Sequence, residues 1–117
     1  MYRCMLRAKL HMARVTEANI NYSGSLTVDE DLMELTGMVA YEKIMVSNVT
    51  NGERFETYII PGERGARQIC LNGAAARRGV VGDRVIIFSF CYVREEELAH
   101  YQPKIVVLSQ ENNPLPL

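Results

Sequence analysis

The sequence lacks any long apolar segment. No apolar run reaches the roughly 20 residues of a membrane-spanning helix. Residues 1–9 also lack the apolar stretch that a secretory signal peptide carries. From these absences we expect a soluble cytoplasmic protein that has no membrane partner.

Neither basic nor acidic residues are in large excess. Lys and Arg together number 13, Asp and Glu number 14, and the net charge is −1. The basic residues are scattered, apart from the pair Arg77-Arg78. Proteins that bind nucleic acids through phosphates need a basic surface, so we expect no nucleic-acid partner.

Cysteine is scarce and follows no metal-binding spacing. The three residues are Cys4, Cys70 and Cys91, which cannot all pair within one chain, and no CxxC or Cys/His pattern is present. We therefore expect no metal site. The thiols are expected to be free, and buried or inert, in a reducing compartment.

The sequence does contain enough apolar material for one β-rich domain. Of its 117 residues, 48% are hydrophobic, which suits a single domain with its own core. Six or seven short strands are expected, at about residues 2–9, 11–22, 43–49, 54–60, 68–71, 84–92 and 104–108. This pattern favours a small closed β-barrel, mainly β with short helices, and leaves a β-sandwich as the alternative.

Local signals add detail to this fold. Asp29 or Thr27 is expected to cap a short helix that Gly37 ends. Asn51-Gly52 lies between two β-rich runs and predicts a hairpin. Pro61-Gly62 is expected to stop the second strand of that hairpin.

The later segments are interpreted in the same way. Residues 84–92 form a continuous apolar run, which predicts a central strand buried on both faces. Single helical turns are expected at 74–78 and 95–99. The tail, residues 111–117, is expected to be frayed or bound to a partner.

The turn Ser23-Gly24-Ser25 carries the main functional hypothesis, although alone it is an ordinary loop. The polar residues that accompany it are also ordinary when taken singly. Lys9 suits an exposed strand lysine, Arg54 a solvated arginine, Tyr58 an aromatic packed on a sheet, His11 a structural histidine, and Asn72-Gly73 a turn. Only their combination points to a site.

Several blocks of sequence, in order, resemble the aspartate 1-decarboxylase family, whose members use a pyruvoyl group to make β-alanine for pantothenate and coenzyme A. The blocks are Met5-Leu6 with Lys9-Leu10-His11, Tyr22-Ser23-Gly24-Ser25, residues 48–58, Glu63-Arg64-Gly65, residues 71–76, and Gly82-Asp83. Each block is weak alone, but their distances from Gly24-Ser25 make the joint match specific. The resemblance covers about residues 1–108.

The resemblance implies a fold and an assembly. A member of this family is a closed six-stranded double-psi β-barrel with short helices. Here it would be one domain, residues 1–117, assembled as a homotetramer. The precursor would cut itself between Gly24 and Ser25. The products would be a β chain, residues 1–24, and an α chain, residues 25–117, that begins with a pyruvoyl group made from Ser25.

The resemblance also implies roles in self-cleavage. The Ser25 hydroxyl would attack the carbonyl of Gly24, where the absence of a Cβ would permit a strained turn. Thr57 would stabilise the oxyanion, and His11 would assist processing or hold the geometry of the site. Ser23 stands where the family often has an acid, which bears on the speed of processing, and a maturation factor is a further candidate partner.

For decarboxylation, the resemblance implies that the pyruvoyl group holds the amino group of L-aspartate as a Schiff base and accepts electrons. Arg54 and Lys9 would bind its carboxylates. Tyr58 would donate a proton to the carbanion. The implied substrate-binding residues are Lys9, Arg54, Thr57, Asn72, Gly73, Ala74 and Ala75.

Thr57 and Tyr58 present a difficulty. Adjacent residues on a strand point to opposite faces, yet the resemblance assigns both to one site. We therefore predict a bend or bulge near residues 57–58.

Two other functions remain open from the sequence. A non-catalytic barrel that serves as a binding or assembly module would need neither Ser25 nor the pairing of Arg54 and Lys9 with Tyr58 and Asn72. A pyruvoyl decarboxylase for histidine, arginine or S-adenosylmethionine would keep the cleavage site and differ in substrate.

Overall fold

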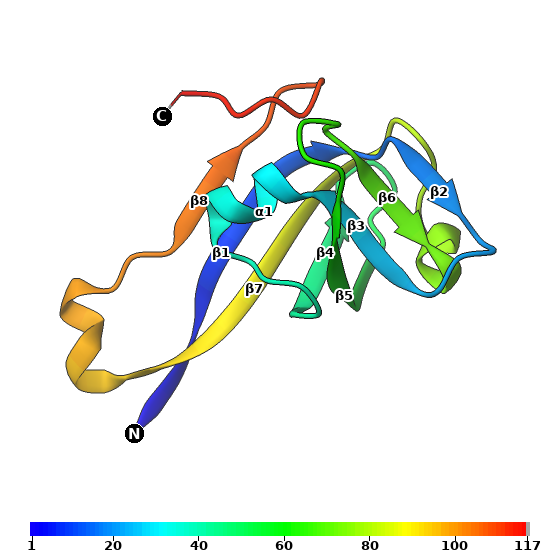
Figure 1. Ribbon diagram of the computed structural model, residues 1–117. Coiled ribbons are helices and arrows are strands. Elements are labelled where there is room, and N and C mark those ends of the chain that lie inside the picture. The colour runs from blue at the N-terminus through cyan, green and yellow to red at the C-terminus, as the bar shows by residue number, and fades with distance from the viewer. Residues whose placement is uncertain (117) are drawn as a thin grey trace.

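The computed structural model describes residues 1–116 and is mainly β (Figure 1). The strands are β1 (Tyr2–Arg14), β2 (Glu17–Asn19), β3 (Ser25–Asp29), β4 (Lys43–Asn48), β5 (Arg54–Gly62), β6 (Ile69–Asn72), β7 (Arg84–Arg94) and β8 (Lys104–Val107). The helical segments are α1 (Glu30–Thr36) and the 3-10 helices η1 (Gly73–Arg78) and η2 (Glu95–His100). Within residues 1–116, no helix has the length and apolar character needed to cross a membrane.

One sheet contains these strands, in the order β2-β6-β3-β5-β4-β7-β1-β8. Only Val15 and Thr16 separate β1 from β2, and the Thr16 N–H donates to the Ile69 carbonyl of β6 at 2.8 Å. The continuous segment from β1 through β2 therefore pairs with β7 at its beginning and with β6 at its end. This double pairing closes the sheet into a barrel of six strand positions, with β8 added outside the ring. The prediction of a small, mainly β barrel with short helices is confirmed.

The barrel interior is apolar because alternate side chains of each strand point inward. Leu10, Ile87 and Val46 lie side by side on β1, β7 and β4, and all three are fully buried. On the opposite face of β7, Phe88 is half-buried and Phe90 is exposed. β7 is central, as predicted, but the prediction that both its faces are buried is wrong, because its outer apolar residues lie on the surface of the chain.

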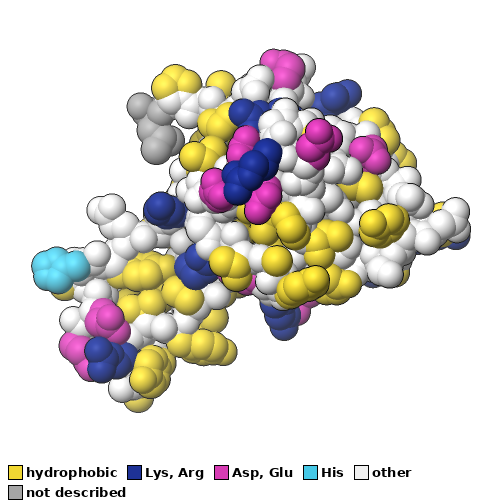
Figure 2. Space-filling model, in the orientation of Figure 1, with side chains coloured by type: hydrophobic (Ala, Val, Ile, Leu, Met, Phe, Trp, Pro, Cys, Tyr) yellow, Lys and Arg dark blue, Asp and Glu magenta, His cyan; other side chains and the backbone are white. Residues whose placement is uncertain are grey.

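Beyond the barrel, the first residues of β1 and the last residues of β7 form a two-stranded arm that leads into η2 (Figure 1). Tyr2, Phe90 and Tyr92 of this arm are exposed. Figure 2 shows hydrophobic side chains on the arm and along the adjoining underside of the barrel. Apolar patches of this kind commonly mark surfaces that bind another protein.

The local signals for the helix are confirmed. Asp29 caps α1, with its side chain accepting from the Asp31 N–H at 2.8 Å, and Gly37 ends the helix at φ 77°. α1 buries Leu32 and Met33 and contacts β1 and β8.

The hairpin is also confirmed, since β4 and β5 pair antiparallel across the Asn51-Gly52 turn. β5 continues through Pro61 and ends at Gly62, two residues beyond the predicted strand 54–60. Both residues stay in the strand because its end pairs in parallel with β3.

The prediction of a frayed tail is wrong for its first part. Asn112 is buried, and its amide nitrogen donates to the carbonyls of Arg14 at 2.9 Å and Arg67 at 3.0 Å. Pro114 forms an isolated antiparallel β-bridge with Leu108. These contacts hold the tail against the barrel, while Leu117 lies outside the described residues.

Candidate active site

Ser25 is buried at the first position of β3, with 1% of its surface exposed. Antiparallel pairing with β6 places it opposite Asn72. The Asn72 side-chain nitrogen donates to Ser25 Oγ at 3.0 Å and to Thr27 Oγ1 at 2.8 Å. The Ser25 hydroxyl donates in turn to the Ser23 carbonyl at 3.2 Å. Its oxygen is therefore held beside the peptide bond that precedes it.

Cys70 determines which way the Asn72 amide faces. Burial, together with the nearby Glu17 carboxylate, raises the pKa of the Cys70 thiol, which therefore stays protonated at neutral pH. Its Sγ lies 3.1 Å from Asn72 Oδ1 and can donate to it. This contact leaves the amide NH2 group to face Ser25. Sequence reasoning missed Cys70 and Thr27, whose available signal was their alternation with Asn72 and Ser25 on paired strands.

Gly73 provides the closest approach of backbone to backbone at the site. It has φ +60°, and a Cβ added there would lie 2.7 Å from the Gly24 nitrogen and 2.8 Å from both Gly24 Cα and the Tyr22 carbonyl oxygen. At Gly24 itself, an added Cβ meets nothing within 4 Å. The expected need for a glycine at residue 24 to permit a strained turn is therefore wrong for this structure, and the steric requirement lies at Gly73.

Gly73→Ala is expected to push the segment 22–24 away from β6, because that backbone cannot give way without moving the turn. We expect cleavage after residue 24 to slow by at least about tenfold, since reacting groups must be placed to within about 1 Å. Intact-mass spectra taken during maturation measure the rate. Gly24→Ala is the steric control for folding and should keep the wild-type Tm. Wild-type cleavage kinetics in Gly73→Ala would contradict the assignment.

A pocket of about 220 Å³ lies next to this turn. Gly24, Phe55, Glu56, Thr57, Ala74, Ala75 and Arg78 line it. Thr57 reaches it from the inward face of β5, which also carries the buried Ile59. The structure thus brings together seven predicted site residues, at or beside this pocket: Gly24, Ser25, Thr57, Asn72, Gly73, Ala74 and Ala75.

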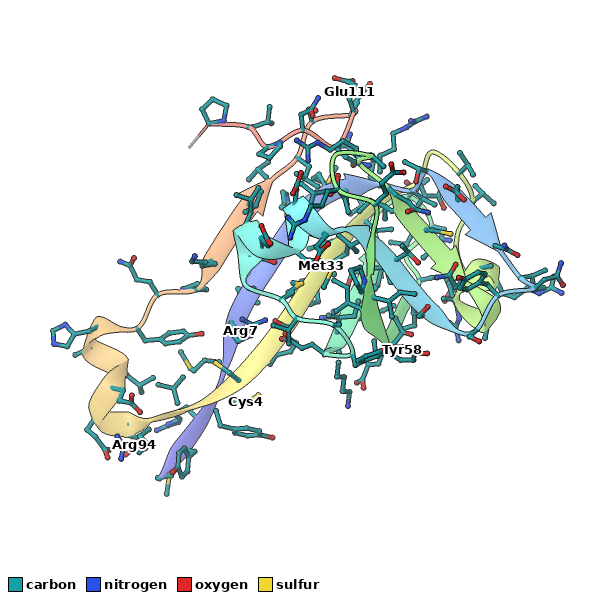
Figure 3. The ribbon with its side chains drawn as sticks, viewed as in Figure 1. Cys4, Arg7, Met33, Tyr58, Arg94 and Glu111 are labelled. Atoms are coloured by element: carbon teal, nitrogen blue, oxygen red, sulfur yellow. The ribbon has the colours of Figure 1, made fainter. Side chains whose placement is uncertain are left out.

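Lys9, Arg54 and Tyr58 lie on the outer faces of β1 and β5 and do not line this pocket. Lys9 is paired with Phe88, and the Arg54 guanidinium lies 5.5 Å from the centroid of the Phe88 ring. Tyr58 shares the outer face of β5 with Arg54 but is four residues farther along, or about 14 Å at 3.4 Å per residue. Figure 3 shows Tyr58 at the rim of the barrel. The parallel pairing of Leu26 with Ile59 puts Ser25 and Tyr58, one residue earlier on each strand, on the same face of the sheet. Lys9 and Arg54 do not line the pocket.

His11 lies on β1 and is half-buried. Burial, followed by the positive charges of Lys9 and Arg84, lowers the pKa of His11, so the ring is neutral at neutral pH. Its Nδ1 is buried and has no hydrogen-bond partner among residues 1–116.

Residues 57 and 58 themselves are regularly paired, and the nearest bulge lies one residue farther along β5, opposite Ile59. The pairing of β4 with β5 continues without a register shift from Ser47–Arg54 to Lys43–Tyr58. Thr57 and Tyr58 therefore face opposite sides of the sheet, as regular alternation requires. The irregularity lies on the segment that pairs with Ile59. The Tyr41 N–H donates to the Ile59 carbonyl, and the Ile59 N–H donates to the Glu42 carbonyl.

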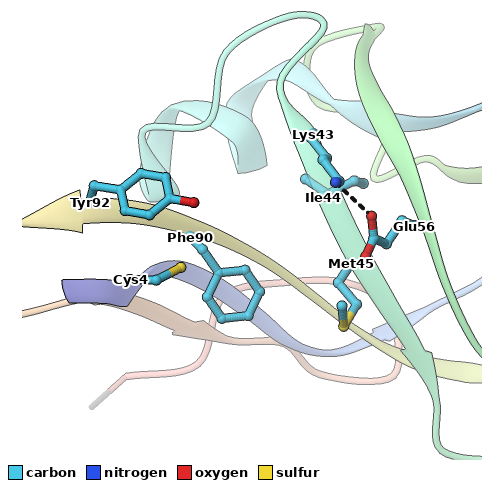
Figure 4. Close-up of a pocket in the computed structure, with 7 residues that line it drawn as sticks. All are labelled: Cys4, Lys43, Ile44, Met45, Glu56, Phe90 and Tyr92. Carbon is cyan, nitrogen blue, oxygen red and sulfur yellow. Dashed lines mark ion pairs between the residues drawn. The ribbon is translucent and has the colours of Figure 1, made fainter. Parts of the chain in front are cut away.

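Another pocket, of about 260 Å³, opens on the outer face (Figure 4). Cys4, Lys43, Ile44, Met45, Glu56, Phe90 and Tyr92 line it. Its polar feature is the ion pair of Lys43 and Glu56 at 2.8 Å, which raises the pKa of the lysine. We place the candidate site at the smaller pocket, because it contains the Gly24 backbone. No group of three His, Cys, Asp or Glu side chains suited to a metal ion occurs in the described part of the chain.

Comparison with known proteins agrees with the resemblance in the sequence. The family model described as aspartate decarboxylase matches residues 1–115. The chain is 58% identical to the aspartate 1-decarboxylase of Bacillus licheniformis, over 96% of this chain and 88% of the relative. It is 54% identical to that of Bacillus subtilis over the same shares, and 57% identical to that of Ralstonia nicotianae, over 96% of this chain and 93% of the relative.

Proposed function

Because the chain belongs to the aspartate decarboxylase family, we propose that it converts L-aspartate to β-alanine and CO2 after cutting itself between Gly24 and Ser25. The observation that carries this proposal is the buried Ser25 hydroxyl, held between the Asn72 amide and the Ser23 carbonyl, next to the Gly24–Ser25 bond and at the edge of a small pocket. β-Alanine made in this way serves the synthesis of pantothenate and coenzyme A.

The residues around Ser25 fit a pyruvoyl group. The Asn72 NH2 group is aimed at the Ser25 side chain, so it can donate to an oxygen there. Gly73, Ala74 and Ala75 keep side-chain bulk away from the pocket. Once formed, the group supplies a ketone that binds the substrate amino group and an electron sink for the loss of CO2.

Self-cleavage begins when Ser25 Oγ bonds to the Gly24 carbonyl carbon. The carbon–nitrogen bond then breaks, and the hydroxyl proton ends on the Ser25 nitrogen, which leaves an ester. Elimination removes the Cα proton of residue 25 and breaks its Cβ–Oγ bond, which forms the Cα–Cβ double bond of dehydroalanine and leaves Gly24 with a free carboxylate. Water hydrolyses the remaining dehydroalanine, releases ammonia and leaves the ketone. Thr57 is the candidate donor to the oxyanion of the first step, because it faces the pocket that Gly24 lines.

Substrate binding needs the outer-face residues as well. Arg54 supplies a planar fork for one carboxylate of aspartate, and Lys9 supplies a second positive charge. Tyr58 is the candidate proton donor. Tyr58 is on the same face of the sheet as Ser25. Arg54 lies four residues away from Tyr58 along β5, or about 14 Å at 3.4 Å per residue, so a site that also holds Arg54 and Lys9 needs a second copy of the chain. This requirement, with the exposed apolar arm, supports a homotetramer.

The test is an intact-mass measurement on the purified protein, combined with an assay for β-alanine. We expect two fragments, residues 1–24 and 25–117, with the larger one lacking a free amino terminus and reacting with a carbonyl reagent. Turnover should be found with L-aspartate and not with glutamate, histidine, arginine or S-adenosylmethionine. A chain that stays uncut and never yields β-alanine would refute the proposal.

A further inference from the structure

We propose that Tyr41 is a positioning residue, whose ring holds the Tyr58 phenol in the orientation that donates a proton to the substrate. The inference rests on the proposed function, in which Tyr58 is the proton donor. Tyr41 lies in the segment between α1 and β4 and belongs to none of the blocks that carry the family resemblance.

The Tyr41 backbone adopts a conformation that is unusual for its side chain. The Glu42 N–H donates to the Val39 carbonyl at 3.1 Å, which makes Tyr41 the third residue of a β-turn. Its φ is 72°. Turns that need a positive φ at this position normally take glycine or asparagine, because a Cβ is crowded there. A bulky aromatic residue at this position therefore strains the turn.

The turn is fixed from several sides. The Arg7 Nε donates to the Glu42 carboxylate at 3.0 Å, and the same carboxylate accepts from the Val39 N–H at 3.1 Å. The Tyr41 N–H donates to the Ile59 carbonyl at 2.7 Å, while the Ile59 N–H donates to the Glu42 carbonyl at 3.0 Å. Two residues thus oppose one, which is a β-bulge. Bulges redirect side chains, and this one lies one pair beyond Lys43 and Tyr58.

The side chain that the bulge redirects meets Tyr58. The two ring centroids are 6.3 Å apart and the rings are inclined by 40°, within the usual range for an aromatic pair. Tyr58 is 37% exposed, at the rim of the barrel, so the Tyr41 ring is one of the neighbours that limit its side-chain rotation.

Burial does not explain why a tyrosine is present at residue 41. Its side chain is 77% exposed, so it contributes little to the core. Strain that persists without burial commonly accompanies a functional constraint. The contact with Tyr58 supplies that constraint, because it orients the group that must reach the substrate carbon.

Three variants separate the ring from the backbone. Tyr41→Phe keeps the ring and the strain, and should match the wild type in kcat, KM and Tm. Tyr41→Ala removes the ring, and Tyr41→Asn removes the ring and relieves the strain. Both are expected to lower kcat by about tenfold with KM within about twofold. Tyr41→Asn alone should raise the Tm by a few degrees.

A double-substitution cycle tests whether Tyr41 acts on kcat through Tyr58. A merely structural role of Tyr41 would lower kcat by the same factor with or without the Tyr58 hydroxyl. If Tyr41 acts through Tyr58, then Tyr41→Ala should have no further effect on kcat in a Tyr58→Phe background. All variants are first checked by mass for complete cleavage, so that kcat refers to matured enzyme.

The possible results test the decarboxylase activity, the role of Tyr58 and the role of Tyr41 separately. A wild-type protein without decarboxylase activity refutes the proposed function, and a fully active Tyr58→Phe refutes the role of Tyr58. If the wild-type protein is active and Tyr58→Phe loses activity, a wild-type kcat in Tyr41→Ala and Tyr41→Asn overturns the inference about Tyr41. So does an equal loss in the Tyr58→Phe background.

Discussion

Ser25→Ala is expected to leave the chain uncut and to reduce β-alanine formation to the level of buffer alone. In the proposed mechanism the side chain of Ser25 is both the nucleophile for cleavage and the source of the pyruvoyl group, so its loss removes both steps. Thr27, whose hydroxyl accepts from the same Asn72 amide, cannot replace it, because its hydroxyl does not belong to the residue that follows Gly24. An intact-mass spectrum and an assay for released CO2 measure the two losses.

Ser23→Ala is the matched control for this experiment. The Ser25 hydroxyl contacts the backbone carbonyl of Ser23, which alanine retains. We expect Ser23→Ala to be cut at the same bond and to decarboxylate aspartate. Cleavage after residue 24 in Ser25→Ala, or an uncut chain in Ser23→Ala, would contradict the assignment of Ser25 as the nucleophile.

Asp29→Asn is expected to lower the free energy of unfolding by about 3 kcal/mol. The Asp29 side chain is fully buried. It accepts from the backbone N–H groups of Asp31 at 2.8 Å, Gly65 at 3.1 Å and Arg67 at 2.7 Å. The NH2 group of an asparagine at this position would face backbone N–H groups, which are also donors. It would have no acceptor there, and one of the N–H groups would lose its own.

The same side chain makes stability depend on pH in a defined way. Burial alone would raise the pKa of Asp29, but the hydrogen bonds from Arg67, Asp31 and Gly65, with the Arg67 charge, outweigh it and lower the pKa below its ordinary 3.8. The stabilisation is therefore fully present above the unfolded-state pKa and is lost as pH falls through the folded-state pKa. The gap between wild type and Asp29→Asn should be constant between about pH 7 and 5 and narrow below about pH 4.

Urea unfolding in a Ser25→Ala background measures this gap on an uncut chain. Glu34→Gln is the control, because its ion pair with Arg64 is exposed to solvent and should matter little. A gap that stays constant in acid, or a fully stable Asp29→Asn, would contradict the role given to the buried carboxylate.

The parts of the fold that follow local rules could be predicted from the sequence. Asp29 and Gly37 bound α1 because capping depends on neighbouring residues, and Asn51-Gly52 forms its hairpin for the same reason. The closure of the barrel could not be derived from these rules. It depends on Thr16 meeting Ile69, which is 53 residues away in the chain.

The candidate site shows the same division. The motifs located Ser25, Thr57 and Asn72, and the structure gathers them at one turn. That Tyr58 faces the opposite side of β5 from Thr57, and that Lys9 and Arg54 lie outside this pocket, depends on strand register, which no motif reports. Tyr41 was not recognisable from the sequence, because tyrosine is an unusual choice for a position that needs a positive φ.

The continuous segment from β1 through β2 imposes an order of events on maturation. Both strands belong to residues 1–24, and this segment lies between β7 and β8 at one end and against β6 at the other. A cut after Gly24 would leave two polypeptides interlocked, since the smaller one could depart only by exposing the fully buried Leu10 and Val15. The site at Ser25 is itself assembled from β3 and β6. If the chain cuts itself as proposed, folding must therefore come before cleavage, and the cut protein is a non-covalent complex whose parts were aligned while they were still one chain.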